Sequence, residues 1–505
     1  MKRANTYTAA VLALLLIVGS GCKESYFDIN NNPNSATQSP AELVLPSALN
    51  ATATYMNTSF AFLNLWMGYW NWSGNYSIGQ QDKNYQFTTS FNNAIWNTAY
   101  TRLKDYNYVE TQGKSRNQPY LQAIGKVMKA FHYQILVDTY GNVPYTSALQ
   151  GLSNAQPAYD NGQAIYESLM VQLDSAQTLI QQGNTRVGNG ETSLGIGNND
   201  VMFKGDMGKW ARFTNTLKLK MLLRQSEKSD RQAYIQTQLA KLKASTAGFL
   251  RAGENASVNP GYINSDNRQS PFYGTFGYGV NGATVENYNL YRANKYAVDF
   301  YRTTNDDRIG FFYAPVAGTA NFVATNFGTV NPLVNSQTSG LGSGVLVSAS
   351  QDAVVLSSHE ALFLQAEAAQ RGWISGSAQT LYESAITESY RNLGVEDDQG
   401  TAAQYAQAYY SQAINNVGWT ASTNKIQAII TQKWASLNGF SPFEAWSDYR
   451  RLGLPAVPIS QEPSTTIKQI PVRLLYPQTE YSYNSTNVAA QGTVSQFTSK
   501  IFWEN

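Results

Sequence analysis

The chain has 505 residues, of which 14% are charged and 13% aromatic, with 33 tyrosines and 10 tryptophans. It holds 36 basic and 34 acidic side chains, and two of the basic ones lie in an N-terminal segment that we expect to be removed. A mature chain without net charge has no overall field to attract DNA or an anionic membrane surface. Nucleic acid is therefore excluded as the main partner.

The N-terminus has the pattern of a secretory signal. Lys2 and Arg3 precede an uncharged run at 9–18, and the small residues of 19–21 lead to Cys22. The run is too short to cross a bilayer, so we predict that residues 1–21 are a signal peptide. A buried N-terminal helix is the alternative, and it is disfavoured because such a helix should show polar positions on one face.

Cys22 is the only cysteine in the chain. It cannot form an internal disulfide, and an unpaired cysteine in an exported protein needs a separate explanation. Its position after three small residues resembles a bacterial lipoprotein acylation site, although Gly19 stands where that pattern usually has leucine. Lys23-Glu24 resembles the short charged tag of surface lipoproteins. Residues 22–40, which are rich in asparagine and proline, are expected to form a tether.

Helical periodicity dominates the chain after the tether. Apolar residues recur at spacings of three and four near 120–137, 165–180, 210–221 and from Leu362 to Ala369, and Ser377 is a candidate N-cap for a further helix. The residues that carry this pattern are Tyr120, Ile124, Val127, Phe131, Ile135, Ile165, Leu169, Leu173, Ala176, Ile180, Trp210, Phe213, Leu217 and Met221. Paired helices with short joins predict a mainly α fold of stacked, TPR-like helix–turn–helix units.

Long segments rich in Gly and Asn separate these helices. We expect residues 183–200 to be an exposed loop, and residues 253–350 to form loop-rich insertions with a few short β hairpins, including one at Val345–Val347. Binding residues are usually found on such loops when a rigid scaffold supports them.

Motifs for catalysis or metal binding are not found. The two histidines, His132 and His359, fall within or beside helical stripes, and we expect both to be structural. The segment that begins at Asp28 fails as a calcium loop, because Pro33 replaces its glycine and Ser39 its final acid. We predict no cofactor and no catalytic residue, and the sequence does not decide whether a metal ion binds. Two carboxylates suffice for glycoside hydrolysis, so a lipid-anchored glycoside hydrolase remains an alternative.

The segment 66–76 is unusually rich in aromatic and amide residues. Tyr and Trp rings stack on the apolar faces of sugars, and Asn bonds to their hydroxyls. The alternative is that these rings pack the first helix onto its neighbours, which is favoured for Trp66. The candidate ligand contacts are Trp70, Trp72 and Tyr76, with Tyr278, Tyr288 and Tyr291 from the second loop region.

Seven phrases, in order, resemble SusD/RagB-like outer-membrane lipoproteins, especially the SusD-like 2 branch. They cover nearly the whole mature chain, and together they are far more specific than any single one. The phrases lie at 27–34, Asp138–Tyr145 with Pro157–Asp160, Gly205–Arg224, Glu360–Ala368, Gln432–Trp434, Glu444–Arg451, and Ile470–Pro477. We expect the residues of these phrases to stabilise the fold and not to bind ligand. Trp434 and Trp446 are expected to anchor the C-terminal segments, and Arg450 and Arg451 are expected to pair with acids or backbone carbonyls.

The resemblance implies a single SusD-like α-helical domain at 41–505 whose loops form the ligand face. It implies a protein on the outer membrane that faces the cell exterior and is lipid-anchored through Cys22. It further implies binding of an oligosaccharide or peptide, without catalysis, and delivery to a SusC-like TonB-dependent β-barrel transporter. A surface scaffold without a small ligand is the second alternative.

Overall fold

The computed structural model describes residues 39–505. The signal peptide, Cys22 and most of the tether lie outside the described residues. The chain divides into two units, Met1–Pro40 and Ala41–Asn505, and every helix and strand named below belongs to the second. Among residues 39–505, no helix is both long enough and apolar enough to span a bilayer.

The second unit is built mainly of helices. Its α-helices are α2 (Ala41–Thr58), α3 (Ala61–Trp66), α4 (Gln80–Asn84), α5 (Ala94–Ser115), α6 (Pro119–Tyr140), α7 (Gly162–Gly188), α8 (Met207–Arg224), α9 (Gln232–Ala244), α10 (Pro271–Phe276), α11 (Glu286–Leu290), α12 (Lys295–Thr303), α13 (Ile309–Phe312), α14 (Ser358–Gln370), α15 (Ala378–Leu393), α16 (Ala402–Tyr410), α17 (Lys425–Ser436), α18 (Pro442–Leu452), α19 (Gln478–Tyr483) and α20 (Ser485–Ala489). Short 3-10 helices are η3 (Gly151–Asn154), η4 (Gly197–Asn199), η5 (Ser229–Arg231) and η6 (Asn335–Gln337).

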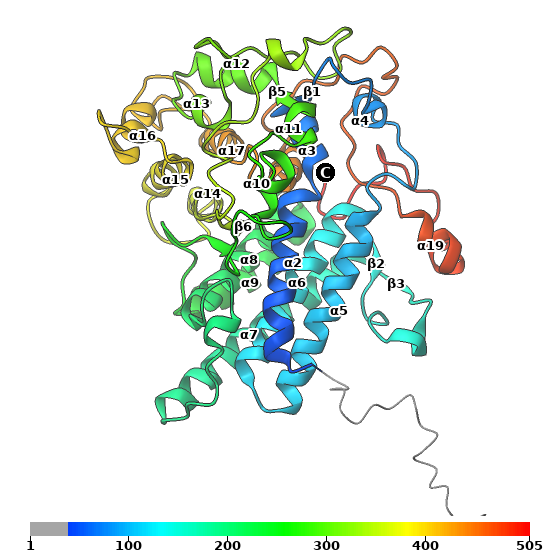
Figure 1. Ribbon diagram of the computed structural model, residues 1–505. Coiled ribbons are helices and arrows are strands. Elements are labelled where there is room, and N and C mark those ends of the chain that lie inside the picture. Colours follow the sequence, from blue (N-terminus) through cyan, green and yellow to red (C-terminus); the bar gives the residue numbers. More distant parts are fainter. Residues whose placement is uncertain (1–38) are drawn as a thin grey trace, which may run out of the picture. The chain divides into compact units, whose positions relative to one another are not determined.

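Consecutive helices pack against each other as pairs. Helix α5 packs on α6, α6 on α7, α14 on α15, and α15 on α16 (Figure 1). The ends of these helices follow the capping signals in the sequence: Ser377 accepts a hydrogen bond from the Thr380 amide at the start of α15, and Gly141, with φ of 79°, ends α6. The expected mainly α fold with TPR-like helix pairs is confirmed.

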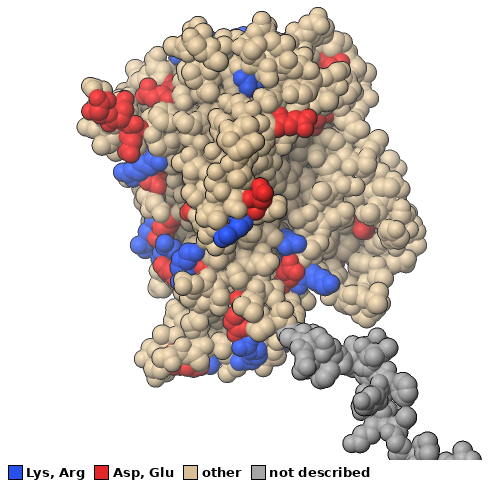
Figure 2. Space-filling view, in the orientation of Figure 1, with Lys and Arg blue, Asp and Glu red and all other residues tan. Residues whose placement is uncertain are grey.

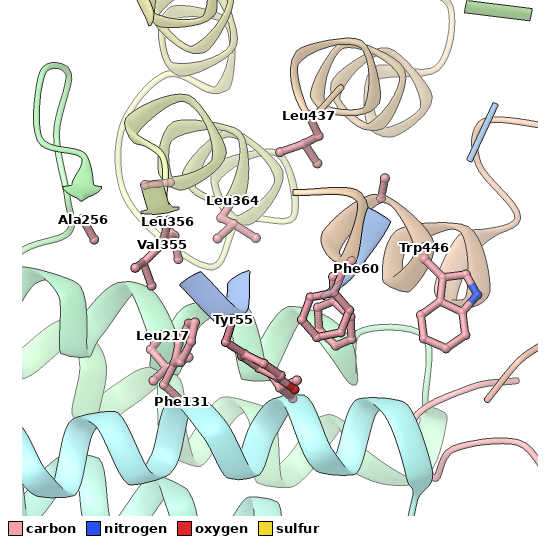
Figure 3. Close-up of a cluster of buried hydrophobic side chains, with 14 of the residues drawn as sticks. Tyr55, Phe60, Phe131, Leu217, Ala256, Val355, Leu356, Leu364, Leu437 and Trp446 are labelled. Carbon is pink, nitrogen blue, oxygen red and sulfur yellow. The ribbon is translucent and has the colours of Figure 1, made fainter. Parts of the chain in front are cut away.

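One apolar core joins the helix pairs. Figure 3 shows Tyr55, Phe131, Leu217, Leu364 and Trp446 within one cluster of buried side chains, to which they contribute from α2, α6, α8, α14 and α18. Each of these side chains is at most 1% exposed. Because helices far apart in sequence contribute to the same core, each apolar stripe is covered by a neighbouring helix.

A buried network of ion pairs lies among α6, α8, α14, α17 and α18. Glu444, which is fully buried, lies 2.8 Å from Lys220 Nζ and 2.5 Å from Lys433 Nζ, and it accepts two hydrogen bonds from the Arg224 guanidinium. Burial alone would raise the pKa of Glu444, but the three cations hold it well below its usual range. A buried carboxylate is tolerated only when it is paired in this way.

Arg450 and Arg451 have the structural roles expected for them. Arg450 Nη1 donates to the Asp138 carbonyl at 2.6 Å and lies 3.0 Å from Glu504, while Arg451 pairs with Glu367 at 2.6 Å. The expected anchors, Trp434 and Trp446, are 2% and 0% exposed, and their indole N–H groups donate to the carbonyls of Met67 and Pro471.

Both histidines are structural, as expected. His132 Nε2 lies 2.9 Å from Thr52 Oγ1, and His359 Nδ1 lies 2.9 Å from Asn392 Nδ2. Each ring is fully buried, and burial lowers the pKa of each to about 3. Uncharged imidazoles without access to solvent are packing residues.

The strands form three short antiparallel pairs in the described part of the chain. These are β1 (Trp70–Trp72) with β5 (Tyr291–Ala293), β2 (Val143–Pro144) with β3 (Tyr159–Asp160), and β4 (Ala256–Val258) with β6 (Ala353–Leu356). The pairings of β1 with β5 and of β4 with β6 join distant segments, so they are not local hairpins.

Two local expectations were wrong. Helix α7 continues to Gly188, so the expected loop at 183–200 begins several residues later. Val345–Val347 forms a turn segment instead of a strand, because the Gln351 side chain bonds to the Val345 carbonyl and the Val347 amide in place of a partner strand. Helix α12 lies within the loop-rich region at 253–350, and Asn294 is its N-cap.

Candidate functional site

The two aromatic segments singled out in the sequence meet in the structure. In the β1–β5 pair, Trp72 stands opposite Tyr291 and Trp70 opposite Ala293. Asn294 strengthens the junction, because its amide donates to the Trp70 carbonyl at 3.1 Å. Figure 1 places β1, β5, α11 and α12 at one end of the second unit, away from the start of α2.

Trp72 and Tyr291 form the centre of the cluster. Their rings are stacked, with centroids 4.7 Å apart and an interplanar angle of 27°. Directly opposed aromatic pairs are favourable across antiparallel strands. Gly79 packs against Trp72 so closely that a Cβ there would lie 2.1 Å from Nε1, so only glycine fits this position. Trp72 is 8% exposed and Tyr291 is half-buried.

A second aromatic pair lies next to the first. The half-buried rings of Tyr278 and Tyr288 are 5.6 Å apart, and Tyr273 lies 5.7 Å from Tyr278. The Arg292 guanidinium lies 5.9 Å from the Tyr288 ring centroid and donates to the Asn335 carbonyl at 2.9 Å. Arg292 thus ties the tyrosine pair to the first residue of η6.

The remaining two candidates have different surroundings. Trp70 is 1% exposed, contacts the rings of Phe276 and Tyr291, and donates from Nε1 to Asn438 Oδ1 at 3.1 Å. It therefore supports the cluster from within the core. Tyr76 is half-buried on the adjoining loop, and in the described residues no ring contact joins it to the other candidates.

The loop at 330–335 adds an apolar edge that no local pattern in the sequence predicts. Gly74 N donates to the Leu333 carbonyl at 2.9 Å, and the Asn335 amide donates to Asn75 at 2.7 Å. Val330 is 61% exposed and Leu333 38% exposed. Nothing in the local sequence indicates this contact, because it joins segments about 260 residues apart.

Asp82 is the unusual charged group near the cluster. It lies on α4, which follows the loop of Tyr76, and is 9% exposed, and its Oδ1 has no hydrogen-bond partner among the described residues. Burial raises its pKa to about 7, against the opposing effect of Lys83. The negative field of Asp82, added to burial, raises the pKa of the Tyr291 hydroxyl.

The surface at this end is mostly uncharged on the face that Figure 2 shows, and the exposed charges of α12 (Lys295, Asp299 and Arg302) pair with one another. Figure 2 shows Lys, Arg, Asp and Glu concentrated on the lower and left parts of the view, and mostly uncharged residues at the upper end. Within the described residues, no group of three or more His, Cys, Asp or Glu side chains could hold a metal ion. Half-exposed rings with nearby amides can stack on an apolar ligand face and bond its polar edge.

Paired helices with an aromatic loop face define a helical ligand-binding protein. The family model named SusD-like 2, described as starch-binding associating with outer membrane, matches residues 31–477. The chain therefore belongs to the SusD-like 2 family. Members of this family are binding proteins and not enzymes, they associate with the outer membrane, and glycan binding is their function at the family level. The glycoside hydrolase alternative is thereby set aside.

Solved structures show the same fold. A SusD-like protein from Bacteroides thetaiotaomicron is 23% identical, with a TM-score of 0.73 over 92% of this chain and 99% of that one. A chitin-binding SusD homologue from Flavobacterium johnsoniae is 24% identical, with a TM-score of 0.74 over 91% and 98% of the two chains. A SusD homologue from Bacteroides fragilis is 19% identical, with a TM-score of 0.72 over 92% and 99%. Curated proteins gave no match.

Proposed function

We propose that this protein captures a neutral oligosaccharide on the aromatic surface formed by Trp72, Tyr278, Tyr288 and Tyr291. The observation that carries the proposal is the β1–β5 pairing, which joins two aromatic segments distant in sequence at an end of the unit with few charges. Apolar stacking selects the faces of sugar rings, and the scarcity of charge favours a ligand without charge. An oligopeptide is the alternative ligand.

The test is binding of the purified protein to an array of oligosaccharides and peptides, with hydrolysis products monitored. Tyr288→Ala and Tyr278→Ala should each weaken binding of the glycan hit by about tenfold, since a stacked ring contributes on the order of 1 kcal/mol or more. Trp72→Ala should weaken it as well, but thermal unfolding must accompany this variant because Trp72 is mostly buried.

A matched control is available on α19. Tyr483 is 74% exposed and lies outside the cluster, so Tyr483→Ala should leave glycan affinity unchanged. Equal affinity of the wild type, Tyr278→Ala and Tyr288→Ala would refute this site. Binding of peptides alone would keep the capture role but change the ligand class, and turnover of a glycan would contradict the binding-only role.

We further propose that residues 1–21 are removed, that an acylated Cys22 anchors the protein to the outer membrane facing the exterior, and that residues 22–40 are a tether to a single domain at 41–505. The unit boundary after Pro40 supports this division. Cys22→Ala should release the protein from the membrane fraction; if the variant is retained there, Cys22 is not the anchor.

The proposed partner is a SusC-like TonB-dependent barrel, which receives the ligand. Family membership supports this partner. Affinity purification of the tagged, membrane-anchored protein should recover a barrel of this class in near-equal amount. Recovery of other proteins without a barrel, and without any oligosaccharide binding, would favour the scaffold alternative.

A further inference from the structure

A polar pocket of about 470 Å³ lies among α5, α6, α7 and the loop after β2. This volume falls within the range of sites for small molecules. Its polar lining is provided by Asn107 and Glu110 of α5, Lys126, Lys129 and Tyr133 of α6, and Gln172 of α7. In Figure 1 these helices lie apart from β1 and β5, so the pocket is separate from the aromatic surface.

Helix geometry explains how these side chains meet. Lys126, Lys129 and Tyr133 are spaced by three and four residues, which places them on the same face of α6. On the neighbouring α5, Asn107 and Glu110 are also three residues apart. Gly125 permits the close approach of the two helices, because a Cβ there would lie 2.7 Å from the Glu110 Cβ.

The cations outnumber the acids in this pocket. Glu110 lies 3.0 Å from Lys126 Nζ and 2.7 Å from Lys129 Nζ, so one carboxylate is shared by two ammonium groups. The side chains of all three are 14–21% exposed, which reduces screening by solvent. Among the residues that line the pocket, one positive charge is therefore left over. Asp160 lies next to this lining, and its carboxylate already accepts hydrogen bonds from the amides of Tyr145 and Thr146 and from the Thr146 hydroxyl.

Glu110 Oε2 makes no hydrogen bond and is instead ion-paired with Lys129, so most of the remaining hydrogen-bonding capacity is that of donors. Lys126 also donates to Gln172 Oε1 at 2.6 Å, and Lys129 to Asn107 Oδ1 at 2.9 Å. An ammonium group has only donors, so these contacts orient both amides with their oxygens toward the lysines and their NH₂ groups free to donate. Each ammonium makes two of these contacts and retains a third N–H.

Tyr133 supplies an independent sign of a missing ligand. Its side chain is 2% exposed, and its hydroxyl has no hydrogen-bond partner among the described residues. The Tyr145 ring packs edge-on against it at 4.7 Å and holds it in place. Burying a hydroxyl without a partner destabilises the protein, unless a bound molecule supplies the missing hydrogen bond.

We propose that this pocket is a second ligand site, for a sugar acid whose carboxylate is held by Lys126, Lys129 and Tyr133. The lining has a surplus of hydrogen-bond donors and one surplus positive charge, so it favours an anion with many hydrogen-bond acceptors. The amide groups of Asn107 and Gln172 would donate to ring hydroxyls, and the apolar side chains of Leu149 and Leu169 line the same pocket and suit the ring itself.

The test uses D-galacturonate and D-glucuronate as probes, with D-galactose as the uncharged counterpart. Calorimetric titration of the purified full-length protein should detect binding of at least one uronate. The protein should bind D-galactose at least tenfold more weakly. Tyr133→Phe and Lys129→Gln should each weaken uronate binding by about tenfold, as expected for loss of a hydrogen bond to a charged group. Since the Tyr133 hydroxyl has no partner in the protein, Tyr133→Phe should also keep the thermal unfolding temperature of the wild type.

Lys104→Gln is the matched control, because Lys104 is an exposed lysine of α5 that does not line the pocket. It should leave uronate binding unchanged. So should Tyr288→Ala, which tests the aromatic surface separately. The proposal is overturned if both uronates fail to bind, if D-galactose binds as tightly as D-galacturonate, or if Tyr133→Phe and Lys129→Gln bind like the wild type.

Discussion

Asp82→Asn should stabilise the protein at pH 8 and have little effect at pH 4. In the folded protein the pKa of Asp82 is raised to about 7 from an ordinary value of 3.8, because the carboxyl is buried on α4. Between these two pH values the folded state holds a proton that the unfolded state has lost. Stability is therefore highest below pH 4 and falls as the pH rises toward 7.

The size of this effect follows from the shift. A rise of about three pKa units corresponds to about 4 kcal/mol, an upper limit that is reached above pH 7. Asparagine cannot ionise and has nearly the same shape as aspartate. It therefore removes the free-energy cost of keeping an ionised carboxylate buried at high pH. At 9% exposure, little of the effect is lost to solvent.

The assay is urea unfolding of the wild type and Asp82→Asn at intervals from pH 4 to 8. The quantity of interest is the difference between the two free energies of unfolding. Burial raises the pKa of Glu504 to about 7 and lowers those of both histidines to about 3, so these groups also change the stability between pH 4 and 8. They are common to the two proteins, and their contributions cancel. A difference that stays constant from pH 4 to pH 8 would refute the burial of an ionisable Asp82.

Three further predictions concern the scaffold. Glu444→Gln should cost about 3–5 kcal/mol in urea unfolding, because it leaves three buried cations without their shared acid; a loss below 1 kcal/mol would contradict the network. With pKa values lowered to about 3, His132 and His359 stabilise the fold above pH 6.5, and this contribution is lost as the pH falls toward 3. Between pH 7 and pH 4, the free energy of unfolding of His132→Gln should therefore fall by about 3 kcal/mol less than that of the wild type. An equal fall in both proteins would count against a buried neutral ring at His132. Gly183→Ala should lower the unfolding temperature, because its Cβ would meet a tyrosine ring atom at 2.2 Å, whereas Gly188→Ala on the same helix meets nothing within 4 Å and should not.

Periodicity predicted most of the scaffold because its information is local. The stripe from Tyr120 to Ile135 lies within α6, and Ser377 caps α15 through a bond to a residue three positions away. The same reasoning assigned Arg450 and Arg451 to structure, although their partners, such as Asp138 and Glu367, could not be named without the packing of distant helices.

The ligand surface could be predicted only in part. Composition drew attention to Trp72 and Tyr291, but their stacking depends on a strand pairing across more than 200 residues. Burial separated Trp70 from the surface candidates, which no local pattern could do. Lys126 and Lys129 escaped notice because lysines at this spacing usually mark the solvated face of a helix, and only the packing of α5 and α7 encloses them.

The distribution of charge separates the two proposed sites. Many acids and bases of the shared motifs, such as Glu444 and Arg224, pair inside the scaffold, and the aromatic end of the unit is mostly uncharged on the face that Figure 2 shows. Stacking there changes little with ionic strength. In the pocket on α5 and α6, attraction between the surplus lysine charge and a carboxylate is partly screened by salt, because the side chains of Lys126 and Lys129 are 14% and 21% exposed. Raising the salt concentration should therefore weaken uronate binding and spare the glycan, whereas equal sensitivity of both ligands would contradict this difference in charge between the two sites.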